Sequence, residues 1–143
     1  MKMHLLSFMF ATMLLLASCI TASAQVPGDV QKGQDLFVGN IRFINNGPAC
    51  NSCHNVNMKG FVSGGILAKD LTQSVTRLTA EGVSGIISGL PFPQMKQSYG
   101  TMPLTEQEIA DITAFLKHAD KLAATNQLTT DISKKMLLGG IGG

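Results

Sequence analysis

The sequence predicts an all-α protein, in which short helices alternate with glycine-rich loops. Two observations lead to this class. In several segments apolar residues recur at spacings of three and four, which is typical of a helix that packs on one face. The sequence also contains no pair of strand-like runs joined by a hairpin turn, which would predict a sheet. A chain of 143 residues is long enough for one domain, which we place at residues 25–125.

Residues 1–24 have the features of a secretory signal peptide. Lys2 gives a basic start, an apolar run extends from Leu5 to Leu16, and Ala22-Ser23-Ala24 is a typical cleavage site. The apolar run is shorter than the about 20 residues that a membrane-spanning helix needs. No later segment of the sequence is long and apolar enough to span a bilayer. We therefore expect export, with cleavage after Ala24.

A lipoprotein signal over residues 1–18 is the alternative. Leu16-Ala17-Ser18-Cys19 resembles a bacterial lipobox, in which Cys19 becomes the lipid-carrying first residue. Both signals predict a protein in the periplasm or elsewhere outside the cytoplasmic membrane, either soluble or held by a lipid anchor at Cys19. Both also leave Cys50 and Cys53 as the only cysteine pair of the mature domain, so no disulfide framework is available.

The charge and the aromatic content narrow the function classes. The formal net charge of +2 includes Lys2, so the mature chain is almost neutral, and it contains no basic block that would predict nucleic-acid binding. The whole chain has 7 phenylalanines, 1 tyrosine and 0 tryptophans. Because Phe8 and Phe10 lie in the expected signal peptide, so small a domain has a thin hydrophobic core. A large buried prosthetic group would supply the missing apolar bulk.

Asp29 is expected to cap a first helix that runs to about Val38. Gly33 lies inside this helix, where a glycine costs roughly 1 kcal/mol relative to alanine. Such a glycine usually marks the close approach of another backbone. The segments 40–48 and 55–65 are rich in glycine and are expected to be loops.

A second helix is expected to begin at Thr79, its predicted cap, and to end before Pro91 and Pro93. Its apolar positions follow spacings of three and four. We expect residues 94–103 to be extended or looped.

The clearest helix signal comes next. Thr105 and Glu108 form a capping box, in which each side chain satisfies a backbone N–H at the start of the helix. An apolar stripe follows, made of Ile109, Ile112, Phe115 and Leu116. The tail, residues 126–143, is expected to form a short docking helix and then to fray.

Cys50-Asn51-Ser52-Cys53-His54 is the motif that carries chemistry, and three chemistries fit a Cys-x-x-Cys pair. A redox dithiol needs the pair at the start of a helix in a βαβ setting, and no strands are predicted. A structural zinc site needs four ligands. His118 is the other mature histidine, but it stands alone on a predicted helix, and the adjacent Cys53 and His54 fit one tetrahedral site poorly.

Covalent haem fits the motif best. Two thiols two residues apart add to the two vinyl groups of one macrocycle, and the next residue, His54, reaches the iron from the same side. A methionine as sixth ligand suits electron transfer. Met102 is the candidate, because Pro103 favours an extended backbone before it, which directs the side chain sideways into a pocket. Met95 is expected to be core filler.

These motifs together resemble a small class I bacterial cytochrome c. The resemblance rests on Cys50-Asn51-Ser52-Cys53-His54, on Gly100-Thr101-Met102-Pro103-Leu104-Thr105 and on the capped helix that follows. It extends over about residues 29–120.

The resemblance implies one covalent haem c with its iron. Cys50 and Cys53 would carry the thioether bonds, His54 would be the proximal ligand and Met102 the distal ligand. It also implies that the N- and C-terminal helices cross, which would explain Gly33.

One segment departs from the family pattern. Many members have Gly-Pro-x-Leu after the haem motif, where the proline carbonyl accepts the hydrogen bond of the histidine Nδ1–H. Here Gly65-Ile66-Leu67 stands in that place. The residue whose carbonyl orients His54 is therefore left open.

By this resemblance the protein is an exported monohaem cytochrome c. It would carry single electrons between redox partner proteins, as in a respiratory chain, and would not be an enzyme. One alternative is a haem-linked subunit of a respiratory or oxidoreductase complex, with the tail as a docking element. The other is a haem sensor or enzyme in which a small ligand binds the iron.

Overall fold

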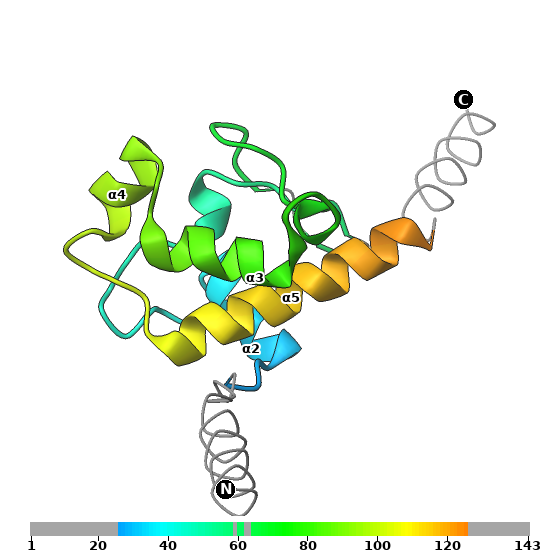
Figure 1. The fold of residues 1–143 in the computed structure, drawn as a ribbon, viewed down its shortest axis with the longest axis horizontal. Coiled ribbons are helices and arrows are strands. Elements are labelled where there is room, and N and C mark those ends of the chain that lie inside the picture. Colours follow the sequence, from blue (N-terminus) through cyan, green and yellow to red (C-terminus); the bar gives the residue numbers. More distant parts are fainter. Residues whose placement is uncertain (1–25, 59, 62–63, 126–143) are drawn as a thin grey trace, which may run out of the picture.

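The computed structural model describes residues 26–58, 60–61 and 64–125, and these form a helical fold (Figure 1). The helices, labelled as in Figure 1, are α2 (Val30–Val38), the 3₁₀ helix η1 (Cys50–Ser52), α3 (Ser74–Gly89), α4 (Pro93–Tyr99) and α5 (Glu106–Ala124). No strand occurs in the described part, so the all-α prediction is confirmed. Of the helices in these ranges, none combines the length and the apolar character needed to cross a bilayer.

The expectations for both ends of the chain fall outside the described residues. These are the signal peptide at residues 1–24, the lipid anchor at Cys19 and the tail at residues 126–143.

Helix α2 begins and ends where the sequence predicts. The Asp29 side chain accepts a hydrogen bond of 2.9 Å from the Lys32 N–H. Helix α2 ends at Gly39, whose φ of 82° lies in the left-handed region that glycine adopts without strain.

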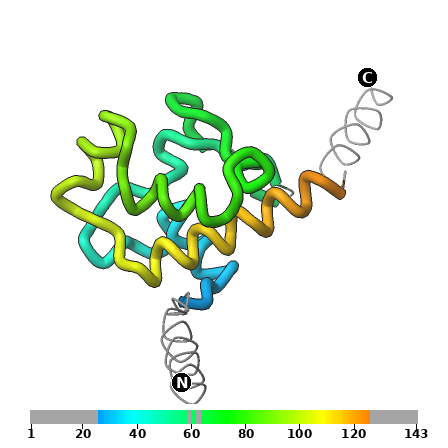
Figure 2. The backbone as a smooth tube through the Cα atoms, in the orientation of Figure 1, coloured from blue at the N-terminus to red at the C-terminus, as the bar shows by residue number. Residues whose placement is uncertain are grey.

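Helix α2 crosses α5, and this crossing forms the centre of the core (Figure 2). A Cβ atom added to Gly33 would collide with the backbone carbonyl of Asp111, so only glycine allows this approach. Beside it, the rings of Phe37 and Phe115 lie 5.2 Å apart between centroids, and both side chains are fully buried. Burying each ring contributes about 1.5–3 kcal/mol. The predicted crossing of the terminal helices is confirmed.

Helix α5 also fastens three other segments through buried carboxylates. Each accepts a hydrogen bond from a backbone N–H that lies at or near the start of another segment. The pairs are Ile44 N–H to Glu108, Asp29 N–H to Asp111 and Thr76 N–H to Asp120, all at 2.7 Å. The capping box of Thr105 and Glu108 is present as predicted. The carboxylates thus fix how the loops and α3 sit on α5.

Helix α3 begins five residues before its predicted cap. Thr79 lies inside the helix, where its φ of 62° and ψ of 166° produce a kink. Its hydroxyl still accepts a hydrogen bond of 3.2 Å from the Gly82 N–H. Thr79 therefore caps the second half of α3, and the first half, which starts at Ser74, carries no recognisable sequence signal.

The prediction of an extended segment at residues 94–103 is wrong for its first six residues, because α4 runs from Pro93 to Tyr99. Pro93 occupies the first turn of α4, where its fixed φ suits a helix and its missing N–H costs nothing. From the sequence alone, Pro93 was expected only to end the preceding helix. Helix α4 matters for function, because it forms one wall of the cavity described next.

Candidate functional site

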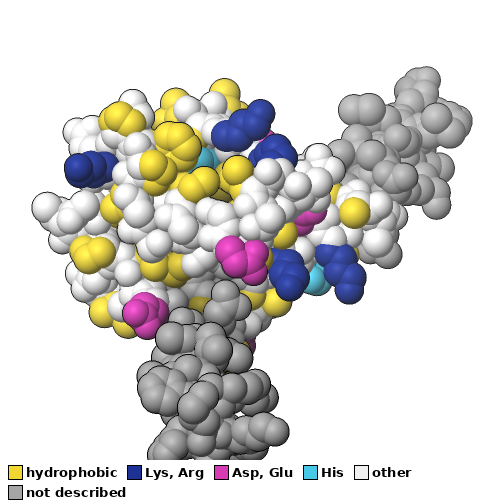
Figure 3. Space-filling model, in the orientation of Figure 1, with side chains coloured by type: hydrophobic (Ala, Val, Ile, Leu, Met, Phe, Trp, Pro, Cys, Tyr) yellow, Lys and Arg dark blue, Asp and Glu magenta, His cyan; other side chains and the backbone are white. Residues whose placement is uncertain are grey.

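A cavity of about 700 Å³ lies between α3, α4, α5 and the segment around η1. Its size is typical of sites for organic ligands, about 300–1,000 Å³. The wall is mainly apolar, and Leu71, Val83, Ile87, Leu90 and Ile112 contribute to it. In the space-filling view, apolar side chains gather on the face formed by α3 and α4 (Figure 3).

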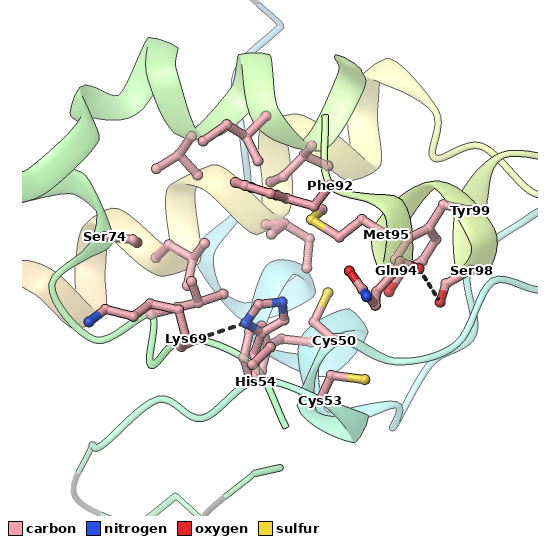
Figure 4. Close-up of a pocket in the computed structure, with 18 of the residues that line it drawn as sticks. Cys50, Cys53, His54, Lys69, Ser74, Phe92, Gln94, Met95, Ser98 and Tyr99 are labelled. Atoms are coloured by element: carbon pink, nitrogen blue, oxygen red, sulfur yellow. Dashed lines mark hydrogen bonds between the residues drawn. The ribbon is translucent and has the colours of Figure 1, made fainter. Parts of the chain in front are cut away.

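The Cys-x-x-Cys-His motif forms one side of this cavity. Helix η1 makes a tight turn in which the Cys50 carbonyl accepts hydrogen bonds from the N–H groups of Cys53, at 3.2 Å, and His54, at 2.9 Å. This turn brings the two sulfur atoms and the imidazole to the same wall (Figure 4). The cysteines are not joined by a disulfide.

The ring of His54 is oriented by a backbone carbonyl. Its Nδ1 lies 2.8 Å from the Lys69 carbonyl oxygen. A carbonyl only accepts hydrogen bonds, so Nδ1 carries the proton and donates. The lone pair is then on Nε2, on the side of the ring that faces the cavity (Figure 4). The source of this carbonyl could not be predicted from the sequence, because no motif marks Lys69.

The segment after the motif is tied to residues 68–72 by further hydrogen bonds. The Ala68 N–H donates to the Cys53 carbonyl at 3.0 Å, and the Leu71 N–H donates to the Asn55 carbonyl at 2.8 Å. The Asn55 side chain donates to the Asp70 carboxylate at 2.7 Å. This cross-linked pair of segments holds the Lys69 carbonyl in place.

The Asp70 carboxyl group favours its ionised form. Partial burial opposes ionisation, but hydrogen bonds from Thr72 and Asn55 and the nearby Arg77 guanidinium outweigh it. Together they hold the pKa of Asp70 below its ordinary value.

The structure does not favour the two rival chemistries of the cysteine pair. Desolvation raises the pKa of the Cys50 thiol to about 12, and the neighbouring Tyr99 side chain offsets this only in part. A redox dithiol needs a lowered pKa instead. Within the described ranges, no group of three or more His, Cys, Asp or Glu side chains is arranged to hold a metal ion. His118 is exposed on α5 and does not line the cavity.

The two candidate methionines differ in their position relative to the cavity. Met95, on α4, lines the cavity, and its thioether points inward on the side opposite His54 (Figure 4). Met102 is not among the lining residues; it follows α4, and its N–H donates to the Tyr99 carbonyl at 3.0 Å. The geometry brings Cys50, Cys53, His54 and Met95 together around one cavity.

A comparison with protein families gives the identity of the domain. The family model described as cytochrome c matches residues 30–120. The chain belongs to the cytochrome c family. Cytochromes c bind haem c covalently through its vinyl groups, and the haem iron transfers electrons to and from redox partner proteins, typically outside the cytoplasm. Searches of curated proteins and of solved structures each found no match.

The residues of this cytochrome fit such a group. A large, mainly apolar cavity has a Cys-x-x-Cys pair on one wall and an imidazole with an available Nε2 lone pair beside it. A thioether, which is a common iron ligand opposite histidine, lies on the other side.

Proposed function

We propose that this protein is an exported monohaem cytochrome c that carries single electrons. Haem c would be attached at Cys50 and Cys53, with His54 as the proximal ligand. The observation that carries the proposal is the hydrogen bond from His54 Nδ1 to the Lys69 carbonyl, at 2.8 Å. It fixes the tautomer that leaves Nε2 free for iron, directly beside the two cysteines.

For the sixth ligand we propose Met95 in place of Met102. Met95 lines the cavity and lies on the side opposite His54, whereas Met102 does not line it. Met95 is also half-buried within a helix, so its position is restrained by the backbone of α4. Met102 stays the ligand that the sequence motif favours, and single substitutions of the two methionines distinguish between them.

The chain would contribute burial and two fixed axial ligands, and the haem supplies one-electron chemistry at its iron. The apolar wall would keep water away from the haem. Two protein ligands would leave no open position on the iron for a small ligand. At the edge of the cavity, Leu67, Leu78 and Phe92 are 83%, 43% and 52% exposed. A redox partner would dock weakly over this edge, as such encounters usually do over small interfaces.

The mass of the mature protein, purified from the cell envelope, tests the attachment directly. We expect the polypeptide mass plus one haem, and we expect the haem to stay with the polypeptide after extraction with acid and organic solvent. The same mass distinguishes cleavage after Ala24 from lipidation at Cys19. A mass without haem would overturn the proposal.

A redox titration tests the carrier role. We expect a reversible one-electron transition without a change of ligands, and no binding of carbon monoxide by the ferrous protein. Rapid carbon monoxide binding would instead favour the haem sensor or enzyme.

A further inference from the structure

Two chain segments on the His54 side of the cavity are joined by a series of hydrogen bonds, each of which is called a rung below. Residues 53–57 and residues 68–72 share five hydrogen bonds, although neither segment is a strand. The rungs are Ala68 N–H to Cys53 O, His54 Nδ1–H to Lys69 O, Asn55 Nδ2–H to Asp70 Oδ2, Leu71 N–H to Asn55 O and Asn57 N–H to Thr72 Oγ1. Next to the His54 rung stands the Asn55–Asp70 rung, one residue further along each segment.

Asn55 and Asp70 each accept further hydrogen bonds besides the one that joins them. The Asn55 side-chain oxygen accepts a hydrogen bond of 2.9 Å from the Gly64 N–H. The second carboxylate oxygen of Asp70 accepts one of 2.8 Å from the Thr72 N–H. The backbone carbonyl of Asp70 accepts one of 2.8 Å from the Arg77 guanidinium. Both side chains are half-buried, so these bonds are partly shielded from water.

The position of Asp70 also restrains that of the Lys69 carbonyl. One planar peptide group contains the Lys69 C=O and the Asp70 N–H. With the Asp70 Cα held in place, this group can only rotate about the axis between the two Cα atoms, and the hydrogen bond to His54 Nδ1 opposes that rotation. Asp70 is held by its carboxylate and by its carbonyl. The Lys69 oxygen is therefore kept 2.8 Å from His54 Nδ1.

We propose that Asn55 and Asp70 are positioning residues that set the reduction potential of the haem through His54. This inference rests on the proposed proximal role of His54. A carbonyl that accepts the Nδ1–H bond makes the imidazole a stronger electron donor to a metal. Stronger donation favours ferric over ferrous iron, so an intact Asn55–Asp70 pair lowers the potential.

The main test is Asn55→Ala, which breaks the pair without changing any charge. We expect a reduction potential above that of the wild type and an exchange rate of the His54 Nδ1–H with solvent that is about tenfold faster. This factor is the scale of one net hydrogen bond. The potential is read by redox titration and the exchange rate by NMR of the ferrous protein. An unchanged potential and exchange rate would overturn the proposal.

An exchange of the two side chains provides a rescue. In Asp70→Asn alone, position 70 has one side-chain oxygen for two donors, the Asn55 amide and the Thr72 N–H. The new NH₂ group therefore faces another amide donor. In the double variant Asn55→Asp/Asp70→Asn, the new carboxylate accepts from the new amide, and the bonds of Gly64 and Thr72 keep their acceptors. Its net charge equals that of the wild type. We expect the Nδ1–H exchange rate to return to near the wild-type value, and exchange as fast as in Asp70→Asn would contradict a positioning role.

Thr76→Val is the matched control. It removes a neutral donor from another aspartate, because the Thr76 hydroxyl donates to Asp120 at 2.6 Å. Thr76 does not line the cavity. We expect lower stability but an unchanged potential and exchange rate; a shift equal to that of Asn55→Ala would mean that the effect is general loosening. If the variants keep their haem, a failed rescue overturns this inference alone, whereas a wild type without haem overturns the proposed function.

Discussion

The Tyr99 hydroxyl donates a hydrogen bond of 2.8 Å to the Pro48 carbonyl, two residues before Cys50. The Tyr99 side chain is 9% exposed and lies at the end of α4, one helical turn after Met95. Its ring also meets Phe43 edge-on, with 6.3 Å between centroids. Tyr99 therefore connects the wall that carries Met95 to the wall that carries the cysteines.

Replacing Tyr99 with phenylalanine tests this connection. The ring and its packing stay, but the Pro48 carbonyl loses its donor. We expect the free energy of unfolding to fall by about 1–2 kcal/mol, the usual cost of leaving one buried partner unsatisfied. Denaturant unfolding of the haem-bound protein measures it. The control is Ser98→Ala, which removes a hydroxyl that bonds only within α4, to Gln94, and should change stability much less.

Two methionine variants decide the sixth ligand. We expect Met95→Ala to lose the sulfur-to-iron charge-transfer band of the ferric protein and to lower the reduction potential, because a thioether ligand raises it. Met102→Ala should keep both, since Met102 does not line the cavity. The absorption spectrum and a redox titration provide the measurements. A band that survives in Met95→Ala and disappears in Met102→Ala would restore the ligand that the sequence motif favours.

The sequence predicted the structure well at positions where only one or two residue types can satisfy the local physical requirement. The capping box of Thr105 and Glu108 and the costly Gly33 both predicted their surroundings, because few structures use such residues in such places. Helix α4 was missed because proline both ends one helix and begins the next, and local sequence does not separate the two roles.

In the candidate site, too, some parts could be predicted from the sequence and others could not. The Cys-x-x-Cys-His spacing predicted one wall of the cavity, because covalent haem attachment needs that spacing. The Lys69 carbonyl could not be predicted, since every residue has a carbonyl and only the fold selects one. Met95 was expected to be core filler, and its place in the cavity wall could not be predicted because it depends on the position of α4, which was itself missed.

The crossing of α2 and α5 predicts a large effect at one glycine and a small, opposite effect at another. Gly33→Ala places a methyl group against the Asp111 carbonyl, so we expect a loss of about 1–3 kcal/mol in the free energy of unfolding. Gly85, within α3, has no atom within 4 Å of an added Cβ. Gly85→Ala should therefore gain about 0.5–1 kcal/mol from helix propensity. Thermal or denaturant unfolding measures both, and equal losses in the two variants would contradict the close approach.

The kink at Thr79 predicts a stabilising substitution. A φ of 62° with a ψ of 166° is a conformation that essentially only glycine adopts, and it costs other residues about 1–3 kcal/mol. Thr79→Gly should remove that strain, and glycine is only a few tenths of a kcal/mol poorer as a cap. We expect a net gain of about 1 kcal/mol, measured by denaturant unfolding. Thr79→Val keeps the strain and loses the cap of Gly82, so it should lose about 1 kcal/mol; a gain there would argue against the kink.

The ionised Asp70 predicts how stability changes in acid. Its pKa in the folded protein lies below the ordinary value, about 3.9 in an unfolded chain. Because the unfolded chain then binds the proton more readily, the contribution of Asp70 to stability is fully present above about pH 4 and is lost as the pH falls through the lower folded pKa. We compare the unfolding free energies of wild type and Asp70→Asn between about pH 7 and pH 2. The wild-type advantage should be constant down to about pH 4 and shrink below it, because the protonated carboxyl no longer accepts as a carboxylate from Asn55 and Thr72. An advantage that persists unchanged in strong acid would mean that Asp70 acts by its shape and not by its charge.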